Sequence, residues 1–243
     1  TGFESIIKET EYLILDFLVG LSAQVWDLHV MKMMYNASDK TNVVFEFVKN
    51  LDLKKIVDYA EESNYEYAQV MRFYYNKIMC ALFEDEESYF RDMKLFFDEN
   101  YNVFDIKEQK NIIITLANYC AFKMRLGQEY YVRILFEINK FRLEKGIAAY
   151  GNGRITKALY HQVLRNALSL NEVKWAENFI KEYTPILNAE HQKTMEALAY
   201  GYVHYVKKDY RKVLTYLNKV EFIDIRDKLH VRILSAKSYY ELD

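Results

Sequence analysis

Hydrophobic positions recur every three or four residues along most of the chain, which is the spacing of one face of an α-helix. In the stretch from Ile155 to Leu170, the positions on this face are Ala158, Leu159, Val163, Leu164, Ala167 and Leu168. Asn171 comes next, and Asn tolerates the left-handed backbone conformation at which helices often end. A second helix is predicted from Val173 to Tyr183, because Pro185 cannot continue it.

The same pair of helices, joined by a short turn, recurs along the sequence. Further helices are predicted over 65–83 and 87–100, 105–126 and 128–145, 188–207 and 210–222, and from Asp224 to the C-terminal end. The breaks at Glu84, Gly127, Asn171, Lys208 and Asp243 are 43, 44, 37 and 35 residues apart. A single helical hairpin cannot bury both of its flanks, so this repeat predicts an all-α fold, a right-handed α-solenoid of antiparallel helical hairpins.

Three segments are expected within one continuous solenoid. Residues 1–64 hold irregular N-terminal helices, a cap or truncated repeats, in which 3–35 is one long helix or a pair broken near Gly20. Residues 65–147 form long hairpins, and residues 154–243 form shorter repeats of which the last is incomplete. The loop from Gly146 to Gly153 is predicted to be a joint between the two halves, with anion binding beside Arg154 as the alternative.

One repeat resembles the tetratricopeptide (TPR) family at several positions. Those positions are Ala197, Gly201, Asp209, Tyr210, Val213, Leu217 and Val220, and the preceding unit contributes Trp175, Ala176, Phe179 and Ile180. The small residue, Gly201 or Ala236 in the last unit, stands where two helices approach most closely. The C-terminal run is also similar to a group of uncharacterised bacterial helical-repeat proteins. The resemblance implies stacked hairpins with a groove lined by the first helix of each repeat.

Composition supports long helices and excludes several other classes. Of the 243 residues 51% are hydrophobic and 16% aromatic, while Gly numbers seven and Pro one. Disordered, collagen-like and disulfide-stapled chains have other compositions, and sheet proteins use more Gly and Pro at their turns. The two cysteines, Cys80 and Cys120, lie in apolar helical stretches and are expected to be buried thiols.

The N-terminal apolar run is expected to be part of a protein that does not enter a membrane. The run from Tyr12 to Leu21 has ten residues and includes Asp16, and Asp27 and His29 follow it. A run of that length is too short to span a bilayer. The basic leader and cleavage site of a signal peptide are not recognised in the sequence. We therefore expect a cytoplasmic protein.

Charge is unevenly distributed although the net value is only −2. Residues 1–106 hold 10 basic and 20 acidic side chains, whereas residues 107–165 hold 11 basic and 4 acidic ones. Residues 166–243 are nearly neutral, with 12 basic and 11 acidic side chains. Solvated helix faces that drift in composition explain this pattern, and the alternative is an acidic partner that docks on the basic central segment.

Recognisable catalytic or metal-binding patterns are missing from the sequence. No two of the five histidines are three or four positions apart on one helix: His29, His161, His191, His204 and His230. The acidic run 84–87 is explained by the positive end of the helix that follows it, rather than by a cation site. No nucleophile elbow or Cys–His arrangement occurs. We predict that the chain is not an enzyme and carries no cofactor or metal.

A TPR-like register predicts a basic and aromatic groove. The first-helix positions that would line it are Arg125, His161, Arg165, Tyr202, Tyr205, Lys237 and Tyr240. Arg binds carboxylates through two parallel hydrogen bonds, and Tyr gives a flat contact surface, so this set suits a protein or peptide with acidic groups. The predicted function is a non-enzymatic interaction scaffold that binds its partner on the concave face. The alternative is an RNA-binding repeat protein that uses the basic 107–165 segment.

Overall fold

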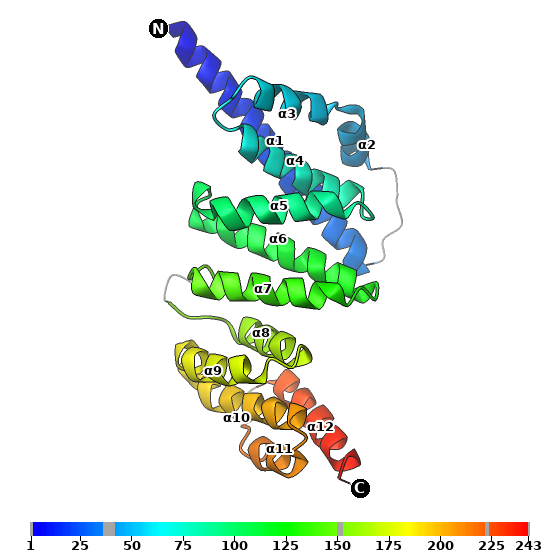
Figure 1. Ribbon diagram of the computed structural model, residues 1–243, viewed down its shortest axis with the longest axis vertical. Coiled ribbons are helices and arrows are strands. Elements are labelled where there is room, and N and C mark those ends of the chain that lie inside the picture. Colours follow the sequence, from blue (N-terminus) through cyan, green and yellow to red (C-terminus); the bar gives the residue numbers. More distant parts are fainter. Residues whose placement is uncertain (1, 36–41, 150–152, 222–223, 243) are drawn as a thin grey trace. The chain divides into compact units, whose positions relative to one another are not determined.

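The structure is a computed structural model that describes residues 2–35, 42–149, 153–221 and 224–242 (Figure 1). In these ranges the chain forms twelve α-helices and two short 3-10 helices, with no strand. The prediction of an all-α fold is therefore confirmed. The chain divides into two compact units, residues 1–118 and 119–243, with the boundary inside helix α6. Each unit is described by itself.

Unit 1 is built around helix α4, which packs against α1, α3 and α5. Helix α1 is a single unbroken helix, so the prediction of one helix holds over that of a pair broken near Gly20. The elements of this unit are α1 (Gly2–Tyr35), α2 (Val43–Asn50), α3 (Leu53–Glu62), α4 (Ala68–Leu82), α5 (Glu87–Asn100), η1 (Tyr101–Val103) and the first part of α6 (Ile106–Arg125).

Aromatic packing and one ion-pair network hold the helices of unit 1 together. The ring of Phe73 on α4 lies 5.1 Å from that of Phe104 and 6.0 Å from that of Phe96, centroid to centroid. At the surface of α4 the guanidinium of Arg72 donates to Glu61 at 2.9 and 2.6 Å and to Asp58 at 2.6 Å. These contacts fix α3 against α4, because a fork-shaped donor binds carboxylates in a set geometry.

Helix α1 is longer and more apolar than the ten-residue run in the sequence indicates. By length and composition it is the one described helix that could cross a membrane, with an 18-residue segment of mean hydropathy 1.4. A core helix and a signal sequence share those properties. The middle of α1 packs inside unit 1, where Leu18, Val25 and Trp26 are buried. Its N-terminal part extends beyond α3 and α4 (Figure 1).

Unit 2 reproduces most of the predicted helices within a few residues. Its elements are the end of α6, α7 (Tyr130–Glu144), α8 (Lys157–Ser169), α9 (Val173–Tyr183), η2 (Thr184–Ile186), α10 (Ala189–Val206), α11 (Tyr210–Leu217) and α12 (Ile225–Tyr240). Helix α11 ends at Leu217, not near residue 222 as predicted. Val220 is nevertheless buried, so the residues after the helix still pack on the core although they are not helical.

Specific residues end and begin the helices of unit 2. Gly127, Asn171 and Lys208 adopt positive φ values of 82°, 59° and 60°, which stop α6, α8 and α10. At the N-termini the side chains of Thr156 and Asp209 accept hydrogen bonds from the backbone of the first turn, at 3.1 and 3.3 Å. Because these caps satisfy amide groups that a helix leaves unpaired, the breaks occur where the sequence pattern places them.

The predicted close approach at Gly201 is confirmed. A Cβ added to this residue of α10 would lie 3.1 Å from Leu217 Cδ2 on α11 and 3.5 Å from Leu234 Cδ2 on α12. The three helices share a core of Leu198, Val213, Leu217, Val231 and Leu234, and a second core joins α7, α8, α9 and α10. Gly201 therefore sets how closely α11 and α12 pack on α10.

Two smaller predictions concern the glycine loop and the cysteines. Gly146 and Gly153 have positive φ values of 69° and 74°. Residues 150–152 between them lie outside the described residues, so the predicted joint, or the alternative anion site, falls on a segment that the structure does not describe. Cys80 and Cys120 are buried, as predicted.

Candidate ligand-binding pocket

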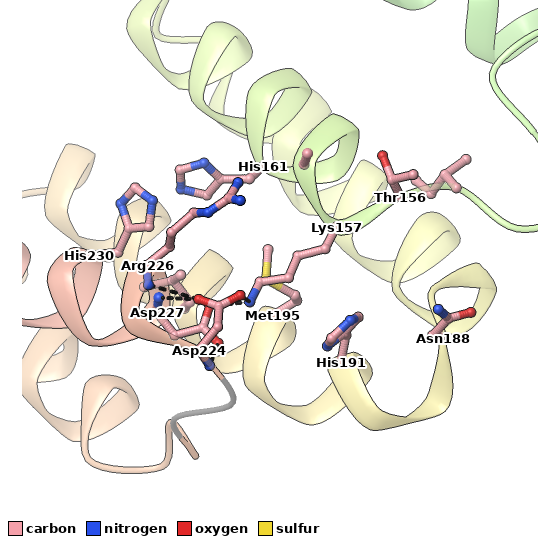
Figure 2. A pocket seen from close by; sticks show the side chains of 13 residues that line it. Thr156, Lys157, His161, Asn188, His191, Met195, Asp224, Arg226, Asp227 and His230 are labelled. Atoms are coloured by element: carbon pink, nitrogen blue, oxygen red, sulfur yellow. Dashed lines mark hydrogen bonds and ion pairs between the residues drawn. The ribbon is translucent and has the colours of Figure 1, made fainter.

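A pocket of about 460 Å³ lies in unit 2 where the first turns of α8, α10 and α12 meet (Figure 2). Met195, Leu198 and Ile155 are the large apolar side chains of its lining. The remaining lining residues are Thr156, Lys157, Ala158, His161, Asn188, His191, Asp224, Arg226, Asp227 and His230. We call this cavity the α8–α10–α12 pocket.

One wall of the pocket is an ion-pair network centred on Lys157. Its ammonium group lies 2.9 Å from Asp224 Oδ2 and also pairs with Asp227, which is fully buried (Figure 2). Asp224 caps α12 by accepting hydrogen bonds from the backbone N–H groups of Arg226 and Asp227 at 2.8 and 3.0 Å. The hydrogen bond from Lys157 lowers the pKa of Asp224 to about 2. This wall ties α8 to α12 and is charged at neutral pH.

Beside this wall lies a second group of side chains, which we call the His161 cluster: His161, Arg165, Tyr202 and His230. The His161 ring lies 4.2 Å from the His230 ring and 5.6 Å from the Tyr202 ring, centroid to centroid. Tyr202 Oη and His230 Nδ1 share a hydrogen bond of 3.0 Å. The guanidinium of Arg165 stands over the Tyr202 ring at 5.9 Å. Three helices therefore contribute to one contiguous polar and aromatic surface.

Both histidines of the cluster are neutral at physiological pH. Burial lowers the pKa of His161 to about 4, and the neighbouring His230 ring and the positive charges of Arg165 and Lys157 act in the same direction. Burial also lowers the pKa of His230, again with a contribution from Arg165. The exposed guanidiniums of Arg165 and Arg226 therefore supply the positive charge next to the pocket at neutral pH, while Lys157 is paired with two carboxylates.

Three of the seven predicted groove residues come together in this cluster: His161, Arg165 and Tyr202. Tyr205 lies one turn further along α10 and packs its ring against Tyr210 at 5.6 Å. The other three are exposed elsewhere in unit 2, with Arg125 at the end of α6 and Lys237 and Tyr240 in the last turns of α12. The structure thus groups the central members of the predicted set.

Sequence reasoning missed His230, Lys157, Arg226 and Asp227. The register gives no signal for the histidine pair, because His230 is six residues after the helix cap Asp224, whereas His161 is five residues after the cap Thr156. Equivalent positions on repeated helices lie on the same side of a stack, and an offset of one residue rotates a side chain by about 100°. The search for histidines three or four apart on one helix could not find a pair from two different helices.

The ligands of a metal ion are not assembled in the described part of the chain. No group of three or more His, Cys, Asp or Glu is placed to hold one there, although His161 and His230 are close. Comparison with known proteins gives no matching family model, curated protein or solved structure. The function therefore has to be argued from the pocket and the cluster themselves.

Proposed function

We propose that this chain is a non-enzymatic scaffold of TPR-like helical hairpins, and that unit 2 binds an acidic segment of a partner protein. The observation that carries the proposal is the pair of exposed guanidiniums, Arg165 and Arg226, beside a pocket with apolar residues in its lining. A peptide that has an acidic residue next to an apolar one matches this combination. The apolar side chain enters the pocket, and the carboxylate pairs with a guanidinium.

The side chain of Arg165 is already ordered for such a contact before a partner binds. Its guanidinium stands over the Tyr202 ring, and this contact restricts the motion of the side chain. Tyr202 is in turn held by its hydrogen bond to His230. Since a side chain that is already ordered loses little entropy on binding, this arrangement favours recognition of a carboxylate.

The chemistry of the pocket lining supports binding rather than catalysis. Among the residues that line it the one hydroxyl belongs to Thr156, and its oxygen accepts a hydrogen bond from the backbone of Leu159. Lys157, the one amine in the lining, is held in ion pairs with Asp224 and Asp227, an arrangement that does not present it as a nucleophile. A nucleophile beside a base is the arrangement that most hydrolytic mechanisms require.

The basic 107–165 segment gives less support to RNA binding than its sequence indicates. Of its 11 basic side chains, Lys123 and Arg142 are buried. Arg133, Lys140 and Lys157 are paired with carboxylates. Nucleic-acid binders instead present a connected row of exposed cations to phosphates. We expect a flat titration of the chain against single-stranded and duplex RNA at low salt.

A peptide array tests the proposal. Ten-residue peptides carry one Glu–Leu pair in a Gly–Ser background, and matched peptides replace Glu by Gln or Leu by Ser. We expect the chain to bind the Glu–Leu peptides and to lose at least tenfold in affinity when either residue is replaced. Arg165→Glu and Arg226→Glu should each cause a similar loss, whereas Lys174→Glu on the exposed side of α9 should not.

Either of two results would overturn the assignment of this site. One is binding that Arg165→Glu and Arg226→Glu leave unchanged. The other is the failure of all Glu–Leu peptides to bind the folded chain. Arg125→Glu is a separate variant, since it tests whether the groove extends to the end of α6 as the sequence register predicts.

A further inference from the structure

The N-terminal half of α1 carries an exposed apolar stripe. Its members are spaced three or four residues apart, so they share one face of the helix. They are Phe3, Ile6, Ile7, Leu13, Ile14 and Phe17, and Thr10 lies between them with its hydroxyl bonded to the backbone of the preceding turn. Phe3 and Leu13 are 72% and 68% exposed. Contiguous apolar surface of this kind marks an interaction site on a folded protein.

Acidic side chains border this α1 stripe on both sides. On helical geometry Glu4 and Glu11 lie along one edge, and Glu9 and Asp16 lie along the other. Lys8 is the one basic residue between positions 2 and 17, so this part of α1 has a net charge of −3. A partner for this face therefore needs apolar side chains flanked by positive charges.

Helix α12 carries an exposed apolar stripe that meets this requirement. Ile225, Leu229, Ile233, Ala236 and Tyr240 recur every three or four residues and are all exposed. The opposite face of α12 is the one that packs inside unit 2, where Val231 and Leu234 are buried. Ile225 and Tyr240 are 83% and 82% exposed.

Basic side chains border this α12 stripe on both sides. Lys228 and Arg232 lie along one edge, and Arg226 and Lys237 lie along the other. Acidic residues of this helix are placed elsewhere, since Asp227 is buried and Asp224 pairs with Lys157. The edges of the two stripes are therefore opposite in charge.

The two stripes also match in length. Phe3 and Phe17 are 14 residues apart, and Ile225 and Tyr240 are 15 apart. At 1.5 Å per helical residue each stripe is about 21–22 Å long. Two helices of this kind can pack along their whole apolar faces with oppositely charged edges in register, as in helix pairs whose partner choice is set by flanking charges.

We propose that α12 of one copy of this chain packs on α1 of a second copy. The contact uses two different surfaces, so a pair of copies still exposes one unused α1 stripe on one copy and one unused α12 stripe on the other. Such head-to-tail contacts close into rings or continue as open filaments. Pairing of two α1 stripes is disfavoured because it opposes two faces of net charge −3, and the same acidic edges disfavour anionic lipid.

Charge exchange in the whole chain tests this contact. One variant reverses an edge of α1 (Glu9→Lys with Asp16→Lys), a second reverses an edge of α12 (Lys228→Glu with Arg232→Glu), and a third combines all four changes. Light scattering after size-exclusion chromatography, from low micromolar to near millimolar protein, gives the mass. We expect the unaltered chain to grow in mass with concentration and both single-edge variants to stay at 29.1 kDa.

The combined variant should recover association, and so should an equimolar mixture of the two single-edge variants. The control reverses two exposed charges on α9 (Lys174→Glu with Lys181→Glu) and should associate like the unaltered chain. Circular dichroism confirms that each variant is helical.

Three results would each overturn the proposal. The first is an unaltered chain that is monomeric at every concentration, and the second is association that is insensitive to the reversals. The third is a monomer that sediments with phosphatidylcholine vesicles, which would assign the α1 stripe to lipid. The variants leave Arg165 and the apolar pocket residues unchanged, so peptide binding and self-association can fail independently.

Discussion

The imidazole rings of His161 and His230 lie 4.2 Å apart, with their planes inclined by 49°. The two residues belong to α8 and α12, and Arg165 and Lys157 lower the pKa of both rings in addition to burial. The charge of Asp227 opposes this effect at both rings and that of Asp224 opposes it at His230, and Lys157 already pairs with both carboxylates. Protonation of either ring thus adds a positive charge to a site that is already basic.

Stability of unit 2 should therefore fall as the pH is lowered. The pKa of His161 is about 4 in the folded chain and 6.5 as its ordinary value. The unfolded state binds protons first, so the contribution of His161 to stability is lost between pH 6.5 and 4 and levels off below that range. A pKa shift of this size in one histidine corresponds to a loss of about 3 kcal/mol in the free energy of unfolding.

Urea unfolding at several pH values measures this loss. Trp26→Phe leaves Trp175 as the single tryptophan, which reports on unit 2. We expect the urea concentration at the unfolding midpoint to decrease as the pH is lowered from 7 to 4.5. His161→Gln should remove much of this decrease. An equal pH dependence with and without His161 would show that other groups cause it.

Gly201→Ala should destabilise unit 2 by about 1–3 kcal/mol. The added methyl group would stand 3.1 Å from Leu217 Cδ2, so α11 has to shift or the leucine has to change rotamer. Gly20→Ala in α1 is the matched control, since a Cβ there meets nothing within 4 Å. That substitution should stabilise unit 1 by up to about 1 kcal/mol, because Gly costs more than Ala in a helix interior. Thermal unfolding of both variants measures the two effects, and equal effects would contradict the close packing.

The helices and the close contact at Gly201 could be predicted from the sequence because both are local. Periodicity sets the helical faces, while Asn171, Gly127 and Pro185 mark their ends. The sequence pattern missed the early end of α11, since Val213 and Val220 are both buried whether or not the chain between them is helical. Burial alone does not distinguish the two conformations.

The candidate site could be predicted only in part. His161, Arg165 and Tyr202 follow from the first-helix register, and three helices then have to meet before His230 joins them. The pairing of Lys157 with Asp227 spans 70 positions and depends on how α12 is placed against α8. No periodicity in the sequence contains that information.

Asp227→Ala should destabilise unit 2 by about 3–5 kcal/mol. Asp227 is fully buried, pairs with Lys157 and completes the N-terminal cap of α12. Removing it leaves a partly buried ammonium group with Asp224 as its one remaining partner, and loss of one member of a buried pair costs this much. Asp209→Ala is the control, because that residue caps α11 at an exposed site and should cost about 1 kcal/mol. Urea unfolding followed by the fluorescence of Trp175 gives the free energy of unfolding of both variants. A similar loss of stability in the two would mean that the buried ion pair contributes little.

Arg142→Met should stabilise the chain, although it removes a charged residue from α7. Arg142 is 7% exposed as a residue, and its Nε and Nη2 atoms are buried without a hydrogen-bond partner in the described part of the chain. Burial lowers the pKa of this group to about 10. An unpaired buried charge is costly and Met fills a similar volume, so we expect a gain of about 1–3 kcal/mol.

Arg72→Met on α4 makes the same substitution where the guanidinium is paired with Glu61 and Asp58. It should destabilise unit 1, because Glu61 and Asp58 lose the guanidinium and, among the described residues, only Asp58 keeps an ion pair, with Lys54. Trp26 reports unit 1 in a Trp175→Phe background, and Trp175 reports unit 2 in a Trp26→Phe background. Opposite signs for the two substitutions are the expected result. If Arg142→Met is as destabilising as Arg72→Met, then Arg142 has a partner in solution, and its buried guanidinium is a binding group rather than a cost to folding.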